Sequence, residues 1–552
     1  MSRPRFAGRA WPRVAAAIAL ALAGCGGDDD GGSGDPDAAA CELPAEGRCA
    51  GNVVERCQDG VLVTEDCTTT QATCTATPGA GTFVCLDACA AAGVTEAGTC
   101  AGDSVRRCEV VGGVRTVVTQ ACAPGQVCEQ PDGQPATCAA DACAGIGPLG
   151  RCDGDRLVRC SGGTPATTDC AAAGQVCGYA DAATGYACVA PGAAFVVTGT
   201  VSYEDRPPLT SGALGALTPA VARGTEVAVV LDQGGTVLAT AHTSDDGSYT
   251  LRYDAAPGAM VHVMVTARST VALRPIRVNR TQTQVHAFGG PSFAATASAV
   301  QDLLVTEASG LAQAWNILDQ AVAAMDLLRL ELGLTPVQLT ARWARGSNTG
   351  TYYSGGTIYM LGSNSDDDGY DDTVILHEIG HFIEDRLGRS DSPGGSHDGS
   401  PTDPNLAWSE GFSTYFAMAV RRRPHYMDSN AGGGWGYDAD TSVTAAPTGT
   451  TIGGDVSEDM VSEILWDVGD GGSGDDDPVT SATHGDVLRV GTTYLRTATL
   501  RAIGESGADL VDFLDGWFVG DGLGTCAGVR DIVTTRRRFP YDYAGPAGAC
   551  PP

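Results

Sequence analysis

The sequence contains no lysine, so arginine alone supplies its fixed positive charge. The 34 basic residues face 66 aspartates and glutamates, and the formal net charge is −32. Phosphate-rich partners are held mainly by attraction to lysine and arginine, and an acidic surface repels them. We therefore expect neither nucleic acid nor anionic lipid headgroups among the partners of this chain.

Histidine is also rare, and the apolar run near the N-terminus is short. The chain has 8 histidines, which makes any close pair of them informative. The apolar run covers residues 14–23 and is too short to span a bilayer as a permanent helix. Four arginines precede it, and this layout is typical of a secretory signal. Export from the cytoplasm is therefore predicted.

The apolar run ends in Leu22-Ala23-Gly24-Cys25, which resembles the bacterial lipobox. This resemblance implies that residues 1–24 are removed and that Cys25 receives a diacylglycerol. An ordinary secreted protein with a chance cysteine is the alternative. Residues 25–40 are acidic and lack large apolar side chains, as expected of a flexible tether. We expect a lipid anchor in the envelope of a Gram-negative bacterium, at the outer membrane or the cell surface.

Cysteine is absent between residues 189 and 525, and 18 of the 21 cysteines lie between Cys41 and Cys188. These form three sets of six, and the second and third cysteines of each set lie in GRCAGNVVERC, GTCAGDSVRRC or GRCDGDRLVRC. The spacing indicates an internal repeat of about 50 residues. An even number of cysteines in an exported chain predicts disulfides. We expect three stapled units over residues 41–190 and a further bridge between Cys526 and Cys550.

Each six-cysteine unit has few large apolar residues, so disulfides must offset the entropy of its chain. The sequence leaves the connectivity open, because six cysteines allow many pairings. Metal binding by these cysteines is the competing hypothesis, and the absence of a CxxC pair disfavours it. A spacer is the favoured interpretation, and a binding stalk is the alternative.

Residues 195–280 alternate between apolar and polar positions in short segments such as FVVTGTVSY, TEVAVVLD and SYTLRYD. The joints DQGG and SDDGS have turn chemistry, so an antiparallel β-sandwich is predicted. The segment TSDDGSYTL resembles the carboxypeptidase regulatory-like family, whose modules act as adaptors. We expect His242 and His262 to be packed or surface residues rather than ligands.

Residues 285–552 are expected to form one larger α+β domain. A helix is predicted from Leu311 to Leu332, with Gly333 as its stop, and LTARW and GTIYML are predicted strands. A second helix is predicted to run to Leu387, with Asp371 or Asp372 as its N-cap. It contains VILHEIGHFIED, residues 374–385.

Residues four apart share a helix face, so His377 and His381 can present two imidazoles to one metal ion. Glu378 lies beside the first histidine, where it can accept a proton from a bound water. This is the HExxH arrangement of zinc peptidases. The alternative is two histidines that share a helix face by chance, and the surrounding sequence has to decide between the two.

Zinc needs a third protein ligand. The positions where a metzincin carries Gly and His hold Glu384 and Leu387, which excludes that class. The predicted helix AWSEGFSTYFAMAV, residues 407–420, resembles the glutamate-bearing helix of gluzincins, the thermolysin-like zinc peptidases. That resemblance implies Zn²⁺ held by His377, His381 and Glu410, with water in the fourth position.

One position departs from the gluzincin pattern, because Thr414 stands where an aspartate would orient a histidine. We expect the orienting partner to come from elsewhere, from Asp371, Asp372 or Glu463. GTIYML is expected to be an edge strand that binds extended substrate. The oxyanion donor stays open among Tyr415, His484 and Tyr494.

An acidic loop precedes the HExxH helix. Asn364, Asp366, Asp368 and Gly369 match the first half of a calcium loop, but Ile375 replaces the glutamate that an EF-hand needs. A looser Ca²⁺ site is kept as a hypothesis beside the favoured solvated loop. His397 and His425 are expected to be structural.

The sequence thus predicts a lipid-anchored zinc endopeptidase in which Glu378 is the base and an extracellular polypeptide is the substrate. A surface adhesion or scaffold protein that retains a zincin fold without turnover is the alternative from another class. A zinc hydrolase acting on a non-protein amide is a third interpretation.

Overall fold

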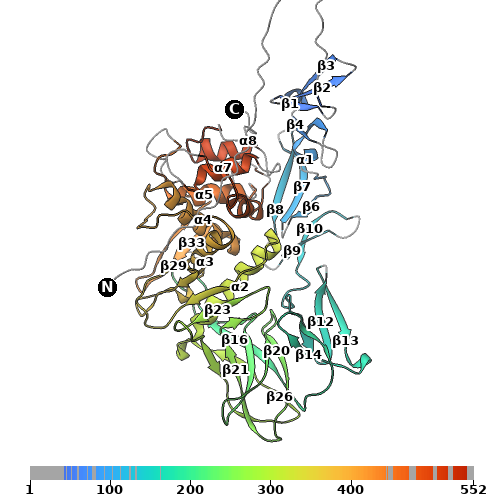
Figure 1. Cartoon of the computed structure of the whole chain (residues 1–552), viewed down its shortest axis with the longest axis vertical. Helices are drawn as coiled ribbons and strands as arrows, with labels where there is room; N and C mark the ends of the chain where they lie inside the picture. Colours follow the sequence, from blue (N-terminus) through green and yellow to red (C-terminus); the bar gives the residue numbers. More distant parts are fainter. Residues whose placement is uncertain are drawn as a thin grey trace, which may run out of the picture.

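The computed structural model describes the chain from residue 43 to residue 543, with gaps at 45–46, 51, 59–60, 71, 77–81, 92–93, 102–103, 112–113, 123–125, 131–133, 162, 210, 443, 445–451, 472–479, 481, 502–506 and 520–525. The predicted signal, Cys25, the tether, Cys550 and the side chain of Cys526 lie outside this description. Within the described residues, no helix is both long and apolar enough to cross a bilayer. Figure 1 shows the cysteine-rich units along one side, a β-sandwich at one end and a helical region at the other.

The three cysteine-rich units repeat one small architecture, a three-stranded antiparallel sheet followed by a two-stranded hairpin. The first contains β1 (Arg48–Ala50), β2 (Val53–Gln58), β3 (Val61–Asp66), β4 (Thr73–Ala76) and β5 (Phe83–Leu86). The second contains α1 (Ala88–Ala91), β6 (Thr99–Ala101), β7 (Ser104–Val111), β8 (Val114–Ala121), β9 (Gln126–Glu129) and β10 (Thr137–Ala140). The third contains β11 (Arg151–Asp153), β12 (Arg156–Ser161), β13 (Thr164–Asp169), β14 (Val176–Asp181) and β15 (Gly185–Val189).

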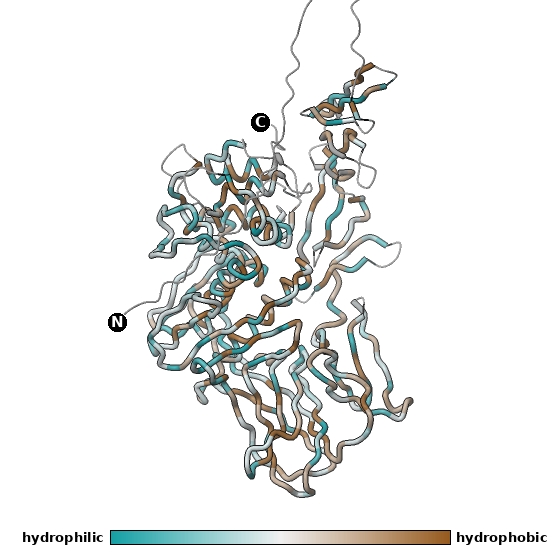
Figure 2. Tube along the Cα trace, in the orientation of Figure 1, coloured by the Kyte–Doolittle hydropathy of each residue, from teal (hydrophilic) through white to brown (hydrophobic). Residues whose placement is uncertain are grey.

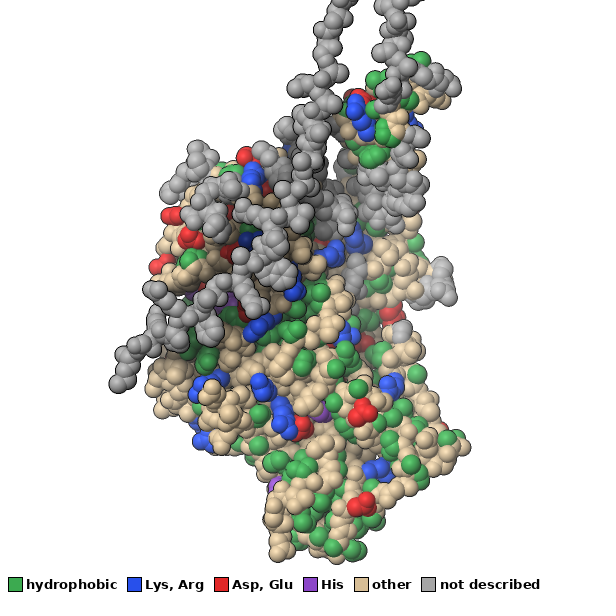
Figure 3. Space-filling model, in the orientation of Figure 1, with side chains coloured by type: hydrophobic (Ala, Val, Ile, Leu, Met, Phe, Trp, Pro, Cys, Tyr) green, Lys and Arg blue, Asp and Glu red, His purple; other side chains and the backbone are tan. Residues whose placement is uncertain are grey.

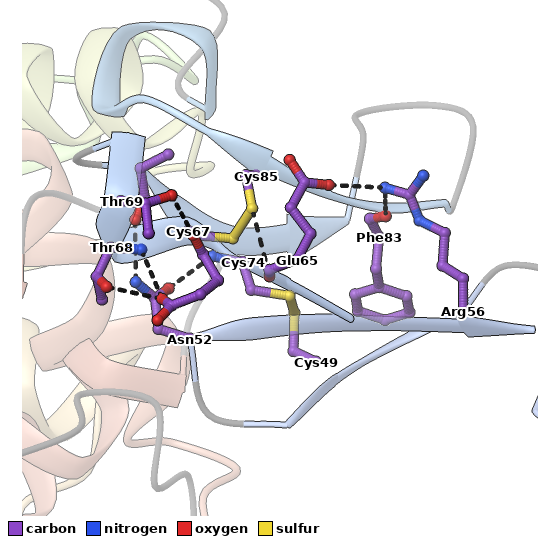
Figure 4. The surroundings of a disulfide bond; sticks show 12 residues. Cys49, Asn52, Arg56, Glu65, Cys67, Thr68, Thr69, Cys74, Phe83 and Cys85 are labelled. Atoms are coloured by element: carbon purple, nitrogen blue, oxygen red, sulfur yellow. Dashed lines mark hydrogen bonds and ion pairs between the residues drawn. A yellow bond between two sulfur atoms is a disulfide. The ribbon is translucent and has the colours of Figure 1, made fainter. Parts of the chain in front are cut away.

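Disulfides form in all three cysteine-rich units, and the connectivity that the sequence left open is the same in the second and third units. The first cysteine pairs with the third, the second with the fifth and the fourth with the sixth: Cys89–Cys108, Cys100–Cys128, Cys122–Cys138, Cys143–Cys160, Cys152–Cys177 and Cys170–Cys188. The first unit has Cys49–Cys74 and Cys67–Cys85, which Figure 4 shows beside Asn52. The amide of Asn52 donates to the carbonyl oxygen of Ala72 and accepts from the backbone of Cys74. Such dense crosslinking is typical of an extracellular or envelope protein.

The β-sandwich consists of two five-stranded sheets. One sheet has the order β17-β16-β20, and β26 and β27 pair in parallel with β16. The other has the order β19-β18-β21-β24, and β25 also pairs with β21. The bounds are β16 (Phe195–Asp205), β17 (Thr218–Val221), β18 (Glu226–Leu231), β19 (Val237–His242), β20 (Ser248–Tyr253), β21 (Met260–Thr266), β24 (Ala287–Gly289), β25 (Phe293–Ala294), β26 (Ser298–Val300) and β27 (Leu303–Val305).

Strand pairing crosses the boundary that the sequence suggested between residues 280 and 285. A third sheet has the order β22-β23-β28-β30-β29, so β22 (Arg268–Ser269) and β23 (Ile276–Asn279) join strands that follow the first long helix. Those strands are β28 (Leu339–Arg342), β29 (Tyr352–Ser354) and β30 (Thr357–Tyr359). Between β23 and α2 the chain returns to the sandwich through β24 to β27. The two regions are therefore interleaved in sequence.

The helical region follows the periodicity of the sequence. The first long helix is α2 (Ala312–Leu332), which ends at Gly333 with a φ of 62°, and the left-handed conformation suits glycine there. The HExxH helix is α3 (Asp372–Leu387), and α4 (Pro404–Arg421) carries Glu410. The other elements are β31 (Gly362–Ser363), β32 (Asp366–Asp367), β33 (His425–Asp428), β34 (Trp435–Asp438), α5 (Glu458–Gly469), α6 (His484–Arg489), α7 (Leu510–Val519), α8 (Cys526–Arg530), the 3-10 turn η4 (Asp368–Tyr370) and the π-helical segments η5 (Val490–Tyr494) and η6 (Asp531–Arg536).

The sandwich and the helical region share one hydrophobic core. A single cluster of buried side chains extends from Phe195 in β16 to Tyr541 near the C-terminus. Helix α2 contributes Trp315, whose indole N–H donates to the hydroxyl of Thr225, beside β18. Figure 2 shows apolar segments in the sandwich strands and in α2. Below, the sandwich and helical region together are called the body.

Candidate functional site

The site is built where α3 and α4 cross. Gly380, inside HEIGH, faces Ser413 so closely that a Cβ atom there would lie 2.7 Å from the Cα of Ser413. The absent side chain lets the two helix backbones approach. On α4, Asp403 caps the first turn by accepting from the backbone N–H groups of Asn405 and Leu406. The crossing places Glu410 opposite the two histidines.

Three ligand atoms converge at this crossing. The Nε2 atoms of His377 and His381 lie 3.1 Å apart, and each lies 3.1 Å from Oε2 of Glu410. All three side chains are buried or nearly so. Below, these three residues are called the triad. The structure therefore brings together the residues that the sequence predicted to meet.

Hydroxyl groups hold the other nitrogen of each imidazole. Nδ1 of His377 lies 3.0 Å from the hydroxyl of Thr414, and Nδ1 of His381 lies 3.0 Å from that of Ser413 and 3.2 Å from that of Ser409. The expectation that Thr414 leaves this role to another residue was wrong, because a threonine hydroxyl reaches the imidazole. With a proton on each Nδ1, both Nε2 lone pairs point toward Glu410.

A buried carboxylate supports this arrangement. Ser409 donates to Oε2 of Glu384 at 2.5 Å, and Glu384 has no solvent exposure. Since its proton is given to Glu384, the Ser409 oxygen is free to accept from His381. In the sequence, Glu384 served only to exclude the metzincin class. In the structure, Glu384 orients the second histidine, His381, through Ser409.

The three carboxylates predicted to orient the histidines act elsewhere. Asp371 stands at the N-cap position of α3, but its side chain caps no backbone group and instead accepts from Ser429. Asp372 pairs with Arg421. Glu463 pairs with Arg537 at 3.0 Å. These predictions were wrong because the three carboxylates meet partners that are distant in the sequence.

The two glutamates of the site have opposite electrostatic surroundings. Burial opposes ionisation of Glu410, but the neighbouring imidazoles of His377 and His381 outweigh it and hold the pKa of Glu410 well below its usual range. Burial raises the pKa of Glu378, which is 6% exposed. Its Oε2 atom is buried and has no hydrogen-bond partner among the described residues, and a buried carboxylate oxygen calls for one. Glu378 is therefore ready to accept a proton.

The donor set fits a zinc ion. Two imidazole lone pairs and a carboxylate oxygen repel one another unless a cation lies among them. Ligands about 2.0–2.1 Å from a tetrahedral Zn²⁺ lie about 3.3 Å from one another, and the separations here are 3.1 Å. Two histidines and a glutamate also form a known catalytic zinc set with one open position.

A cleft of about 930 Å³ leads to the triad, and Glu378 lines it. One wall carries Tyr352 and Tyr353 of β29. Strand β29 is the edge of its sheet, and β30, which lies within GTIYML, is paired on both sides by β28 and β29. The expectation that GTIYML is the edge strand was therefore wrong, and the neighbouring strand takes that place.

None of the three predicted oxyanion donors lines the described part of this cleft. The Tyr415 hydroxyl lies 3.1 Å from Nδ1 of His484, and the ring of Tyr494 packs over Gly516. His484 lines a second cavity of about 260 Å³, beside Thr119 of the second cysteine unit. All three residues are part of the packing of the helical region.

Sequence reasoning missed several residues that do line the cleft, among them His397, Tyr426, Tyr437 and Glu458. His397 was expected to be structural, but its Nε2 lies 3.5 Å from Oε2 of Glu410 and its Nδ1 lies 2.8 Å from Oε2 of Glu458. Its position in the loop that connects α3 to α4 was the only signal that the sequence offered. His425 pairs with Asp438, as a structural residue would.

The acidic loop also contributes to the cleft. Asp366, Asp368 and Asp428 place carboxylate oxygens within 4.8 Å of one another. Asp428 lies far away in the sequence and replaces Asn364 in the predicted set. This group could hold a cation, as the calcium hypothesis expected.

Comparisons with known proteins agree with this picture in part. Residues 333–535 match the Mycolysin C-terminal domain, which is associated with zinc metallopeptidases, and the match includes α3 and α4. The chain therefore contains a metallopeptidase-related domain. A comparison with curated proteins finds no match. Among solved structures, a 9R-lipoxygenase from Cyanothece PCC8801 matches at 14% identity and a TM-score of 0.13, over 24% of this chain and 23% of that one. A likeness this weak carries no argument.

Proposed function

We propose that the protein is a zinc-dependent endopeptidase that hydrolyses extracellular polypeptides. The convergence of the triad at an open cleft, beside Glu378, whose Oε2 has no hydrogen-bond partner among the described residues, is the observation that supports this most. The match of residues 333–535 adds support. In this proposal the domain is gluzincin-like, and Cys25 anchors it to the cell envelope through a lipid.

When bound by the triad, Zn²⁺ would polarise the scissile carbonyl and lower the pKa of a water molecule. Glu378 accepts the proton of the attacking water at its free Oε2 atom. Its raised pKa lets it hold that proton and pass it to the amine that leaves. Thr414 and Ser413 keep the imidazoles in the tautomer that leaves both Nε2 atoms unprotonated.

The substrate lies along the edge strand. The free edge of β29 offers backbone groups to an extended peptide, which would add as a further strand to the sheet. Tyr352 and Tyr353 at this edge line the cleft, so a peptide bound there passes close to Glu378.

His397 donates to the developing oxyanion in this mechanism. The contact with Glu458 raises the pKa of His397, with burial opposing it, and so favours the protonated form that can donate. His397→Gln should lower kcat by about 10²–10³ with a smaller change in KM. An unchanged kcat would remove His397 from the mechanism.

The proposal is tested by zinc content and casein cleavage in the full-length protein, beside a Glu378→Gln variant. We expect one zinc per chain in both, cleavage in the parent, and loss of cleavage in the variant. Glu410→Gln should lose zinc as well as cleavage. Parent protein without zinc would overturn the proposal.

A non-catalytic adhesion or scaffold protein is the second candidate. The exposed third strand of the first cysteine-rich unit supports it, since Val61, Leu62 and Val63 of β3 are all exposed. One bound zinc with no cleavage of casein or of a mixed peptide library would favour this candidate over the enzyme.

A further inference from the structure

One wall of the cleft carries carboxylates that the triad does not use. Asp368 in η4 and Asp428 at the end of β33 both line the cleft that holds Glu378, and Asp366 stands beside them. No arginine is among the described residues that line this cleft. Below, Asp368 and Asp428 are called the acidic wall.

Among the residues that the structure describes, no cationic side chain pairs with the acidic wall. Burial raises the pKa of Asp368 to about 7, and the negative charges of Asp428 and Asp366 add to this effect against a hydrogen bond from Thr351. Burial and the charge of Asp366 also raise the pKa of Asp428, against a hydrogen bond from the side chain of Trp435. The ionised forms are thus disfavoured in the free protein, and a positive charge bound at the wall would relieve this penalty.

The rim beside the acidic wall is aromatic and open to solvent. Trp435 is 53% exposed and Tyr352 is 42% exposed, and both line the cleft. Trp435 lies directly opposite Asp428 in the pairing of β33 with β34. Guanidinium and ammonium groups stack on such rings while they pair with carboxylates. Exposed rings of this kind point to an organic cation with a long apolar stem.

A calcium ion fits this place less well. Calcium takes six to eight oxygen ligands, whereas three carboxylates gather here, and the Asp368 carboxylate already accepts from Thr351. The exposed rings supply no ligand. The surroundings therefore favour a basic side chain over a bare ion.

We propose that the acidic wall is a specificity subsite that binds an arginine or lysine side chain of the polypeptide substrate. This inference rests on the proposed peptidase function and names its substrate class. The contacts are noncovalent: carboxylates of Asp368 and Asp428 pair with the cationic head, and Trp435 and Tyr352 cover its stem.

The test measures binding, so that it does not depend on turnover. Two fluorescein-labelled peptides that differ only in a central arginine or its uncharged analogue citrulline are titrated into the Glu378→Gln protein. Fluorescence anisotropy should show the arginine peptide binding about tenfold more tightly at low salt. The preference should fall below about threefold in Asp428→Asn and separately in Asp368→Asn. Asp153→Asn, which removes one exposed charge in the third cysteine-rich unit, should keep it.

Each outcome decides the matter. Equal binding of the two peptides, or a preference that survives both substitutions in the wall, overturns the subsite. Calcium chloride at millimolar concentration that displaces the arginine peptide reassigns the wall to a metal ion and also overturns it. An arginine preference in a protein that never cleaves casein would reject the peptidase and keep the subsite, whereas cleavage without preference would reject the subsite alone.

Discussion

The cysteine-rich units and the body hold their folds by different means. Buried clusters in the first two units are small, such as Val54, Cys67 and Ala72 in the first. The body is held by one continuous core that the sandwich and helices share. A unit with so little buried apolar surface depends on crosslinks, whereas the body depends on burial. The comparison teaches that a long chain can combine two sources of stability that respond to different conditions.

The third cysteine-rich unit combines both sources of stability, crosslinks and burial. It has the disulfide pattern of the second unit but packs on the sandwich, where Tyr186 and Leu149 join a cluster with Val271. The hydroxyl of Tyr186 donates to the carbonyl oxygen of His242, and the hydroxyl of Ser244 donates to the carbonyl oxygen of Gly150. Three similar sequences thus acquire different environments.

Figure 3 shows arginine side chains scattered over the face drawn there rather than gathered in a patch.

Chemical reduction of the disulfides should give the largest difference in stability between the cysteine-rich units and the body. Each disulfide contributes about 2–4 kcal/mol, so a reductant without denaturant should unfold the first two units and leave the body folded. Hydrogen exchange followed by mass spectrometry should show rapid exchange in β2 and β7 and continued protection in α2. The unreduced protein is the control. Equal loss of protection in α2 would contradict a body held by burial.

A cavity in the shared core should destabilise the body and leave the first two cysteine-rich units folded. Trp315 has no solvent exposure, and Trp315→Ala should cost the body about 3–5 kcal/mol. Sandwich and helices should then melt together at a lower temperature in calorimetry, while the disulfides of the first two units keep β2 and β7 protected from exchange. Leu330→Ala, in the same helix but 62% exposed, is the matched control. Separate melting of sandwich and helices would show that the core is not shared.

Local patterns allowed much of the body to be predicted. The period of residues 311–332 and Gly333 predicted α2 almost to the residue, and the spacing of His377 and His381 predicted a shared face. Glu410 was found because its helix resembles a known class. In each case the information lies within one element, where periodicity and capping determine the structure.

The errors concern contacts between elements. Nothing in the sequence around Asp371 indicates that it meets Ser429, and nothing around His397 indicates Glu458. The edge strand was misplaced by one strand because the order of β30 and β29 depends on which strand pairs with β28. Strand order and side-chain partners are set by tertiary packing, which one sequence does not reveal.

A methyl group added where α3 and α4 cross should weaken the zinc site of the body and leave the cysteine-rich units unaffected. A Cβ atom at Gly380 would lie 2.7 Å from the Cα of Ser413, so Gly380→Ala should push α3 from α4 at a cost of about 1–3 kcal/mol. Zinc affinity, measured by competition with a chelator, should fall, and the cysteine-rich units should be unaffected. Gly192→Ala is the control, because no atom lies within 4 Å of the added carbon there. Unchanged zinc affinity would mean that the crossing tolerates a wider spacing.

The smallest change tests how the third unit is joined to the body. Tyr186→Phe removes a hydroxyl that donates to the carbonyl oxygen of His242 and accepts from the backbone N–H of Thr250. Two buried backbone groups then lose a partner, at a cost of about 1–3 kcal/mol. Urea denaturation should show this loss, and hydrogen exchange should increase in β14 and β15 before it increases in β18.

The Tyr253→Phe variant is a matched control for this last substitution, because the buried Tyr253 hydroxyl has no hydrogen-bond partner in the described part of the chain. Removing it should leave stability unchanged or slightly increased. If Tyr186→Phe were as stable as Tyr253→Phe, the third unit would be attached by its chain connection and apolar contacts alone. It would then belong with the other two crosslinked units rather than with the body.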